Sequence, residues 1–140
     1  MVKKWREIGI GIGLAVATIL FVQFLSTEQT HEFYAMILIL IGAAYIGFAL
    51  ADGRLQQIAI EAIGVIGFSL CAFVGLWFFP LAIPIGYFAH GIWDTVHHPH
   101  GIKTNVTDWY IPFCLAYDWL MAAYIAYWLY HRNSFFEIPM

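Results

Sequence analysis

The chain has 140 residues, of which 62% are hydrophobic and 11% are charged, and its mean hydropathy is +0.77. Soluble domains carry about 25% charged residues, so this composition excludes an ordinary soluble enzyme and predicts an integral membrane protein. The formal net charge is −3. The expected partner is the lipid bilayer, and no nucleic-acid partner is expected.

Five apolar segments predict an all-α fold, a single transmembrane domain over residues 1–140 built as a bundle of five transmembrane helices. A spanning helix needs about 20 residues. The segments are residues 8–25, 33–51, 57–79, 83–97 and 109–130. The fourth is short for a span, so a tilted, broken or re-entrant helix remains an alternative there. The first follows a basic start like that of a secretory signal, but its length and the lack of a cleavage site predict a retained span.

The basic residues predict the orientation of the bundle. With a polar turn at 26–32 and five spans, all basic residues but one fall on the side of the N-terminus. That side carries Lys3, Lys4, Arg6, Arg54 and Lys103, and the other carries Arg132. The positive-inside rule then predicts a cytoplasmic N-terminus, in a protein of the bacterial inner membrane.

The segment 90–100, HGIWDTVHHPH, gathers polar side chains at the end of an apolar stretch. On a helix that turns 100° per residue, one face carries four of them. These are His90, Asp94, His97 and His98. Such a face is how a helix presents several ligands to one metal ion. An alternative for His98 and His100 is that they lie in wet headgroups, but that explanation fails for the deeper His90 and Asp94.

Two further acids lie inside predicted spans. Counting residues places Glu61, His90 and Asp118 at a similar depth, about 10 Å below the same surface at 1.5 Å per residue, so we expect them to meet. Buried carboxylates need a cation, and the spans contain no Lys or Arg, which favours a divalent metal. One alternative is a proton-sharing cluster that only fixes helix packing. Another is that Glu61 pairs with Arg54.

The predicted roles follow from these positions. The predicted metal ligands are His90, Asp94, His97, His98 and Asp118, and the predicted catalytic general base is Glu61. Mixed imidazole and carboxylate ligands favour zinc, before iron or manganese, as the divalent metal. Cys71 and Cys114 lie in apolar segments and are interpreted as small core residues.

The segments HGIWDTVHH and PFCLAYDW, with an embedded Glu61, give the chain a family likeness. It resembles an uncharacterised family of small bacterial multi-span membrane proteins that share an HxxWDxxHH-like box and a later Asp. This resemblance implies a site without implying a reaction. A weaker likeness is to membrane desaturases and hydroxylases, whose histidine boxes include HxxHH. Asp94 stands at the first position of that box, and those enzymes use several boxes to hold two irons, whereas this chain offers one.

The sequence favours a metal-dependent integral membrane enzyme, a hydrolase or an oxidoreductase, acting on a lipid or other hydrophobic substrate in the cytoplasmic leaflet. One alternative is a metal-ion or proton carrier or channel, which needs a polar route continuing to the outer face. No comparable acid or histidine is expected in the outer halves of the spans, which favours the enzyme. Another alternative is a structural subunit or assembly factor of a membrane complex. A second copy of the chain, in a homo-oligomer, is a further possible partner.

Overall fold

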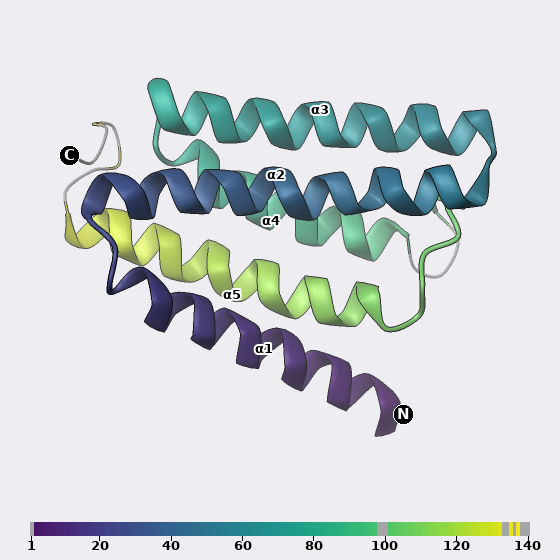
Figure 1. Cartoon of the computed structure of the whole chain (residues 1–140), viewed down its shortest axis with the longest axis horizontal. Coiled ribbons are helices and arrows are strands. Elements are labelled where there is room, and N and C mark those ends of the chain that lie inside the picture. Colours follow the sequence, from purple (N-terminus) through teal and green to yellow (C-terminus); the bar gives the residue numbers. More distant parts are fainter. Residues whose placement is uncertain (1, 98–100, 133–134, 136, 138–140) are drawn as a thin grey trace.

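The computed structural model describes residues 2–97, 101–132, 135 and 137. In this part of the chain five α-helices form, which confirms the all-α prediction (Figure 1). They are α1 (Val2–Val22), α2 (Thr27–Asp52), α3 (Leu55–Trp77), α4 (Ala82–Val96) and α5 (Tyr110–His131).

The helices lie side by side along the long axis of the molecule, and consecutive helices run in opposite directions (Figure 1). α2 packs against α3, and α1 packs against α5. α4 joins these pairs, because it packs against α5 and α3 and also contacts α2. The N-terminus and the α2–α3 and α4–α5 connections therefore lie at one end of the bundle, the N-terminal end, and α5 finishes at the other (Figure 1).

Three of the five helices, α1, α2 and α3, are long and apolar enough to cross a membrane. The prediction of five helices is thus confirmed, but by length and composition only three of them could span a membrane. α4 has 15 residues, fewer than the roughly 20 of a perpendicular span. α5 has 22 residues, many of them Tyr and Trp, which are less hydrophobic than Ile or Leu.

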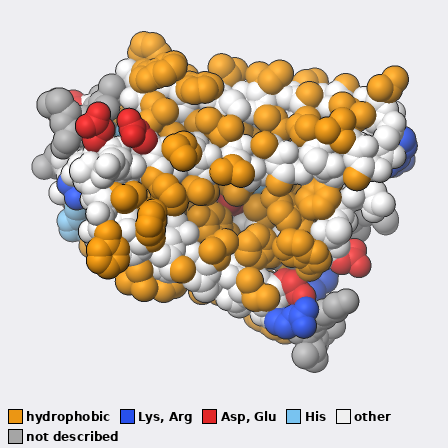
Figure 2. Space-filling model, viewed as in Figure 1, with side chains coloured by type: hydrophobic (Ala, Val, Ile, Leu, Met, Phe, Trp, Pro, Cys, Tyr) orange, Lys and Arg blue, Asp and Glu red, His pale blue; other side chains and the backbone are white. Residues whose placement is uncertain are grey.

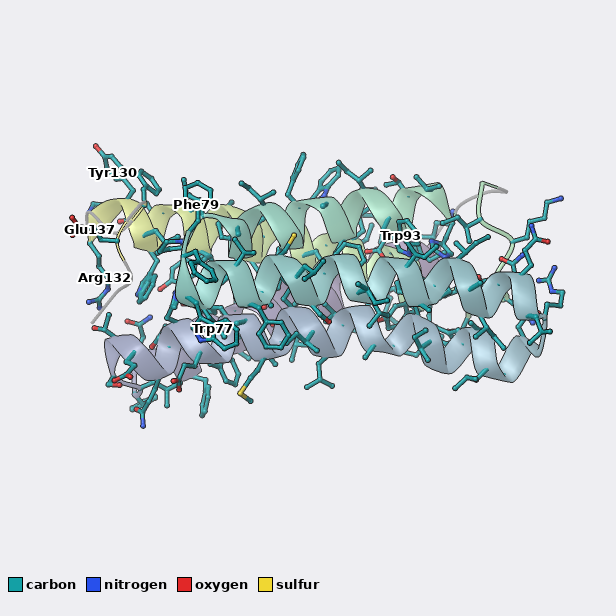
Figure 3. All side chains as sticks on the ribbon, turned by 90° about the horizontal axis from the view of Figure 1, so that it is seen from above. Trp77, Phe79, Trp93, Tyr130, Arg132 and Glu137 are labelled. Atoms are coloured by element: carbon teal, nitrogen blue, oxygen red, sulfur yellow. The ribbon has the colours of Figure 1, made fainter. Side chains whose placement is uncertain are left out.

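The lateral surface of the bundle is apolar, as a bilayer requires. Figure 2 shows hydrophobic side chains over most of one face, with charged side chains gathered toward the two ends. Ile63 and Leu40, for example, are 70% and 62% exposed. Trp77, Tyr130 and Arg132 all lie toward the end of the bundle opposite the N-terminus (Figure 3). Aromatic and basic side chains gathered at one level are typical of a membrane–water interface.

The start of α2 corrects the predicted turn at 26–32. Ser26 caps the helix by accepting a hydrogen bond from the Gln29 amide, and the Gln29 side chain accepts one from the Ser26 amide. This reciprocal capping box begins the helix at Thr27. His31 is therefore a buried helical residue, 2% exposed, whose Nε2 lies 3.0 Å from the Gly75 carbonyl oxygen. The expectation that this half of the bundle holds no histidine comparable in burial to the site residues was wrong.

Two glycines let tryptophans of neighbouring helices approach α3 and α4 closely. A Cβ on Gly64 would lie 2.9 Å from the Trp93 ring, and a Cβ on Gly91 would overlap the indole nitrogen of Trp119. Only glycine leaves room for these rings. The contacts hold α4 between α3 and α5 and so fix the position of its polar face.

Candidate metal centre

Two helices supply the side chains of a buried polar group. His90 and Asp94 lie four residues apart on α4, and Cys114 and Asp118 lie four residues apart on α5. This spacing places each pair on one face of its helix. Since α4 packs directly against α5, the two faces meet. We call these four residues the metal group.

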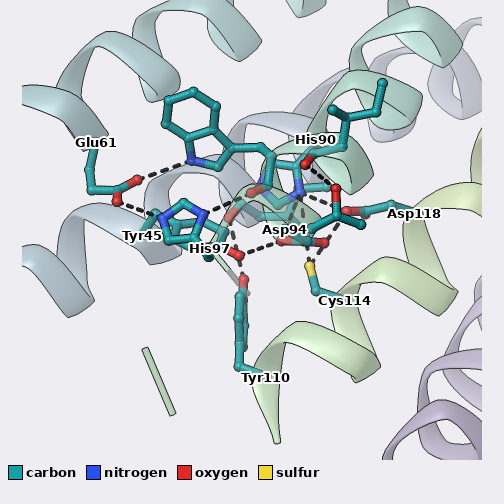
Figure 4. A network of polar contacts seen from close by, with 12 residues as sticks. Tyr45, Glu61, His90, Asp94, His97, Tyr110, Cys114 and Asp118 are labelled. Carbon is teal, nitrogen blue, oxygen red and sulfur yellow. Dashed lines mark hydrogen bonds and ion pairs between the residues drawn. The ribbon is translucent and has the colours of Figure 1, made fainter. Parts of the chain in front are cut away.

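The atoms of the metal group converge on one point (Figure 4). His90 Nδ1 lies 2.6 Å from Asp118 Oδ2 and 3.8 Å from Asp94 Oδ1. The Cys114 thiol donates to Asp118 Oδ2 at 3.5 Å and lies 4.0 Å from His90 Nδ1. One ligand atom from each residue lies within 4.8 Å of all the others.

These separations are close to those of a tetrahedral site. Zinc bonds of about 2.0 to 2.3 Å place neighbouring ligand atoms about 3.3 to 3.8 Å apart. The His90–Asp94 separation of 3.8 Å and the Cys114–Asp118 separation of 3.5 Å match this range. The His90–Cys114 separation of 4.0 Å nearly does. The 2.6 Å contact between His90 and Asp118 is a hydrogen bond, which must lengthen by about 0.7 Å when an ion replaces its proton.

Burial and charge also favour a cation. His90, Asp94 and Asp118 are fully buried and Cys114 is 1% exposed. The other nitrogen or oxygen of each of these side chains has no hydrogen-bond partner, namely His90 Nε2, Asp94 Oδ2 and Asp118 Oδ1, and each such buried atom costs about 1 to 3 kcal/mol. Among the described residues no Lys or Arg is buried. Two carboxylates neutralise one divalent ion, so a metal ion could supply the missing charge.

Cys114 is the member that sequence reasoning missed. It was interpreted as an apolar core residue, yet its sulfur lies between His90 and Asp118. The available signal was its position four residues before Asp118, on the same helix face. A cysteine sulfur beside an imidazole suits zinc better than manganese.

A second polar cluster, the Glu61 cluster, lies beside the metal group (Figure 4). Glu61 Oε1 lies 2.7 Å from His97 Nε2 and accepts a hydrogen bond from Thr104 Oγ1 at 2.5 Å. Its Oε2 accepts from the Trp93 indole at 3.1 Å. His97 Nδ1 lies 2.8 Å from the Trp93 carbonyl oxygen. Glu61 is thus fully buried and bonded from α4 and from the segment after it.

The structure therefore divides the predicted site residues between two clusters. His90, Asp94 and Asp118 meet as expected, whereas Glu61 binds His97 and is not a member of the metal group. Residue counting gives depth but not the neighbour that a side chain faces. α3 packs on α2 and α4, while α5 packs on α1 and α4, so Glu61 and Asp118 approach α4 from different helices.

His97 and Arg54 have other partners than those predicted. Both ring nitrogens of His97 contact other groups, so it accompanies Glu61. His98 and His100 lie outside the described residues. Arg54 does not pair with Glu61 but with Asp52, at 2.5 and 2.7 Å, and this hydrogen bond raises the pKa of Arg54.

Tyr45 of α2 joins the two clusters. Its hydroxyl donates to Asp94 Oδ1. Its ring lies 4.5 Å from that of His97 and 5.5 Å from that of His90. The two clusters therefore form one continuous polar region across α2, α3, α4 and α5.

Two cavities reach this region from different sides. A cavity of about 760 Å³ at the N-terminal end is lined by His97, Arg54 and Lys103. An apolar groove of about 410 Å³ lies between α1, α2 and α5, and Cys114 and Tyr117 form part of its wall. A hollow between α2 and α5 is visible in Figure 2, with acidic atoms inside it. The polar region is thus reached by a polar cavity at His97 and by an apolar groove at Cys114.

The chain belongs to a family of unknown function, DUF6010, whose model matches residues 6–132. The match includes all of the metal group and the Glu61 cluster, and it confirms the likeness to an uncharacterised family. No curated protein and no solved structure matches the chain.

Proposed function

We propose that this protein is a metal-dependent integral membrane enzyme that acts on a lipid or another hydrophobic substrate. The proposal rests on one observation: the fully buried metal group holds two carboxylates, a histidine and a cysteine, with no basic side chain buried among the described residues. All five helices cross the bilayer in this proposal. Because α1 begins at one end of the bundle and α5 finishes at the other, an odd number of crossings is supported (Figure 1).

His90, Asp94 and Asp118 would hold the ion, with Cys114 as a fourth ligand or as the position that substrate displaces. Zinc is favoured over iron or manganese, because the ligand set combines imidazole, thiol and carboxylate. When bound, the metal supplies Lewis-acid activation of water or of a substrate oxygen. The Tyr45 hydroxyl orients Asp94, as partners of metal ligands commonly do.

Glu61 would act as the catalytic base through His97. The Trp93 carbonyl only accepts hydrogen bonds, so His97 Nδ1 must carry a proton. His97 Nε2 and Glu61 Oε1 lie 2.7 Å apart, so a proton on either atom would form a hydrogen bond to the other. His97 also lines the polar cavity. The pair can therefore exchange a proton with water there while Tyr45 contacts both His97 and Asp94.

The groove beside Cys114 supports a hydrophobic substrate. Its volume of about 410 Å³ lies in the range of about 300 to 1,000 Å³ that is typical of ligand sites. Residues of α2 from Phe33 to Ala44 line one wall, which spans about 16 Å at 1.5 Å per residue. A chain-like apolar substrate would enter sideways from the bilayer and reach the metal group at Cys114.

A carrier is less well supported. Its route would continue from the metal group to the far end of the bundle, where His31 is buried. On the buried face of α2, however, Leu38 is fully buried between Tyr45 and His31. Ile83 of α4 and Ile125 of α5 are fully buried hydrophobic residues as well. The described core between the two ends is therefore mainly apolar.

Elemental analysis of protein purified without chelator tests the metal. We expect about one transition-metal ion per chain, lost in His90→Ala but retained in the control His131→Ala, because His131 is exposed and lies outside the metal group. Absence of stoichiometric metal would refute the proposal.

Cobalt substitution then separates an enzyme from a structural site. A catalytic site keeps a coordination position open, so an alkyl hydroxamate should change the visible spectrum of the cobalt protein. An unchanged spectrum with bound cobalt would mean that the site is closed. The metal would then stabilise the fold and catalyse nothing.

A further inference from the structure

A second candidate binding site lies on the opposite side of α1 and α5 from the groove at Cys114. It begins at the N-terminal end as a cavity of about 710 Å³ lined by Lys4, Arg6, Glu7 and Asp108. A second cavity, of about 250 Å³, shares Lys4 and Asp108 with the first and adds Leu115. The two cavities therefore adjoin.

A third cavity continues this path into the apolar part of the bundle. It has a volume of about 400 Å³ and shares Leu115 with the second cavity. Its other walls include Ile8 and Ile12 of α1 and Trp119 of α5. Along α1 and α5 the lining thus changes from charged at the end of the bundle to apolar toward its middle. We call the three cavities together the α1–α5 groove.

The exposed tryptophans at the polar end place it at an interface. Trp5 is 70% exposed and Trp109 is 51% exposed. Trp is enriched where a membrane meets water, because its ring is apolar and its N–H is polar. The charged part of the α1–α5 groove then lies at headgroup level, and its apolar part lies at the level of the acyl chains.

Glu7 is the unusual member of the charged end. It is 4% exposed although it stands in the second turn of α1. One carboxylate oxygen lies 3.2 Å from the Arg6 guanidinium, and the other, Oε2, is buried without a hydrogen-bond partner. A buried carboxylate oxygen needs a donor, and a cationic donor satisfies it best. The structure therefore leaves a position for an N–H donor beside two basic side chains.

We infer that the α1–α5 groove binds one bilayer phospholipid whose headgroup carries a primary ammonium, as phosphoethanolamine does. Lys4 and Arg6 face the phosphate, Glu7 and Asp108 accept hydrogen bonds from the ammonium, and one acyl chain lies along the apolar part. Two basic and two acidic side chains match a zwitterion, not an anion. A choline headgroup has no N–H to donate to Glu7, so the site distinguishes ethanolamine from choline. This inference is independent of the metal group.

Native mass spectrometry of the detergent-purified protein tests the inference with defined lipids. We expect one POPE to be retained in preference to POPC and POPG. Glu7→Gln should weaken POPE retention by about tenfold, because a hydrogen bond to a charged group is lost. The matched control is Glu28→Gln, an exposed acid in the first turn of α2, which should retain POPE.

A second variant keeps the test decisive if Glu7→Gln fails to fold. Asp108 is exposed, so Asp108→Asn is expected to fold while still reducing the preference for POPE over POPC. Equal retention of POPE and POPC by the wild type would overturn the inference. So would an unchanged preference in the folded acidic variants. Tighter retention of POPG would mean that the groove recognises only negative charge.

Discussion

Replacing Asp94 by Asn is the sharpest perturbation of the metal group, because it changes charge with little change of shape. Asp94 is fully buried, its Oδ1 accepts from Tyr45, and its Oδ2 has no partner. Without metal, the wild type must bury this carboxylate beside Asp118, which already binds His90 at 2.6 Å. An uncompensated buried charge costs several kcal/mol. With a chelator present, Asp94→Asn should therefore be as stable as the wild type or more stable.

With metal present, the wild type should instead be more stable than Asp94→Asn. An ion that binds only the folded protein stabilises it by about 4 kcal/mol at a thousand times its Kd. For a chain of this size each kcal/mol corresponds to about 2 to 4 °C, so the wild type should gain about 8 to 16 °C. Asp94→Asn leaves one carboxylate to balance a divalent ion and should gain little. Tryptophan fluorescence melts in detergent, with zinc or with chelator, measure both effects.

The matched control is Asp108→Asn, since Asp108 is an exposed acid outside the metal group. It should show the same zinc response as the wild type. The reasoning fails if Asp94→Asn and the wild type respond equally to zinc. It also fails if Asp94→Asn melts well below the wild type in chelator. The second result would mean that the protein itself, through a protonated His90, already compensates Asp94.

Three further changes test the neighbouring parts of the structure. Tyr45→Phe keeps the ring contacts but removes the donor to Asp94, so the Kd for zinc, measured by competition with a chelating dye, should rise by about ten- to a hundredfold. Gly91→Ala places a methyl group against the indole of Trp119, and a thermal melt should show a loss of about 1 to 3 kcal/mol. Lys103→Cys, exposed at the N-terminal end, should react in intact cells only with membrane-permeant maleimides, as a cytoplasmic site requires.

Each of these changes has a control. Tyr130→Phe, at an exposed tyrosine, should leave zinc binding unchanged. Gly67→Ala should be neutral or slightly stabilising, because no atom lies within 4 Å of the added carbon. Arg132→Cys should show the opposite labelling pattern to Lys103→Cys.

Segment lengths predicted the five helices well, because apolar runs bounded by polar turns leave few alternatives. The largest errors in the helix boundaries lay at two starts: α1 begins at Val2 and not at residue 8, and α2 begins at Thr27, where polar composition predicted a turn over 26–32. The capping box of Ser26 and Gln29 instead starts α2 early. His31 is then buried and contacts Gly75 of α3. No local sequence pattern predicts a tertiary contact of this kind.

The sequence predicted three of the four members of the metal group. The spacing of His90 and Asp94 fixes a shared face, and the depth of Asp118 placed it correctly. The same depth argument did not bring Glu61 into the metal group, because depth says nothing about which neighbouring helix a side chain faces. Cys114 was missed because a cysteine in an apolar helix is usually a core residue.

α4 couples the two clusters, because one of its polar residues contacts α5 and others contact α3. His90 contacts Asp118 of α5, whereas Trp93 and His97 contact Glu61 of α3. The Trp93 ring that donates to Glu61 also packs on Gly64, one helical turn further along α3. The same side chain therefore sets the distance between α3 and α4 and orients the acid. A shift of α4 large enough to lengthen the 2.6 Å contact between His90 and Asp118 must also move Trp93 and His97 against Glu61. Binding of an ion at the metal group should thus change the hydrogen bond between His97 and Glu61.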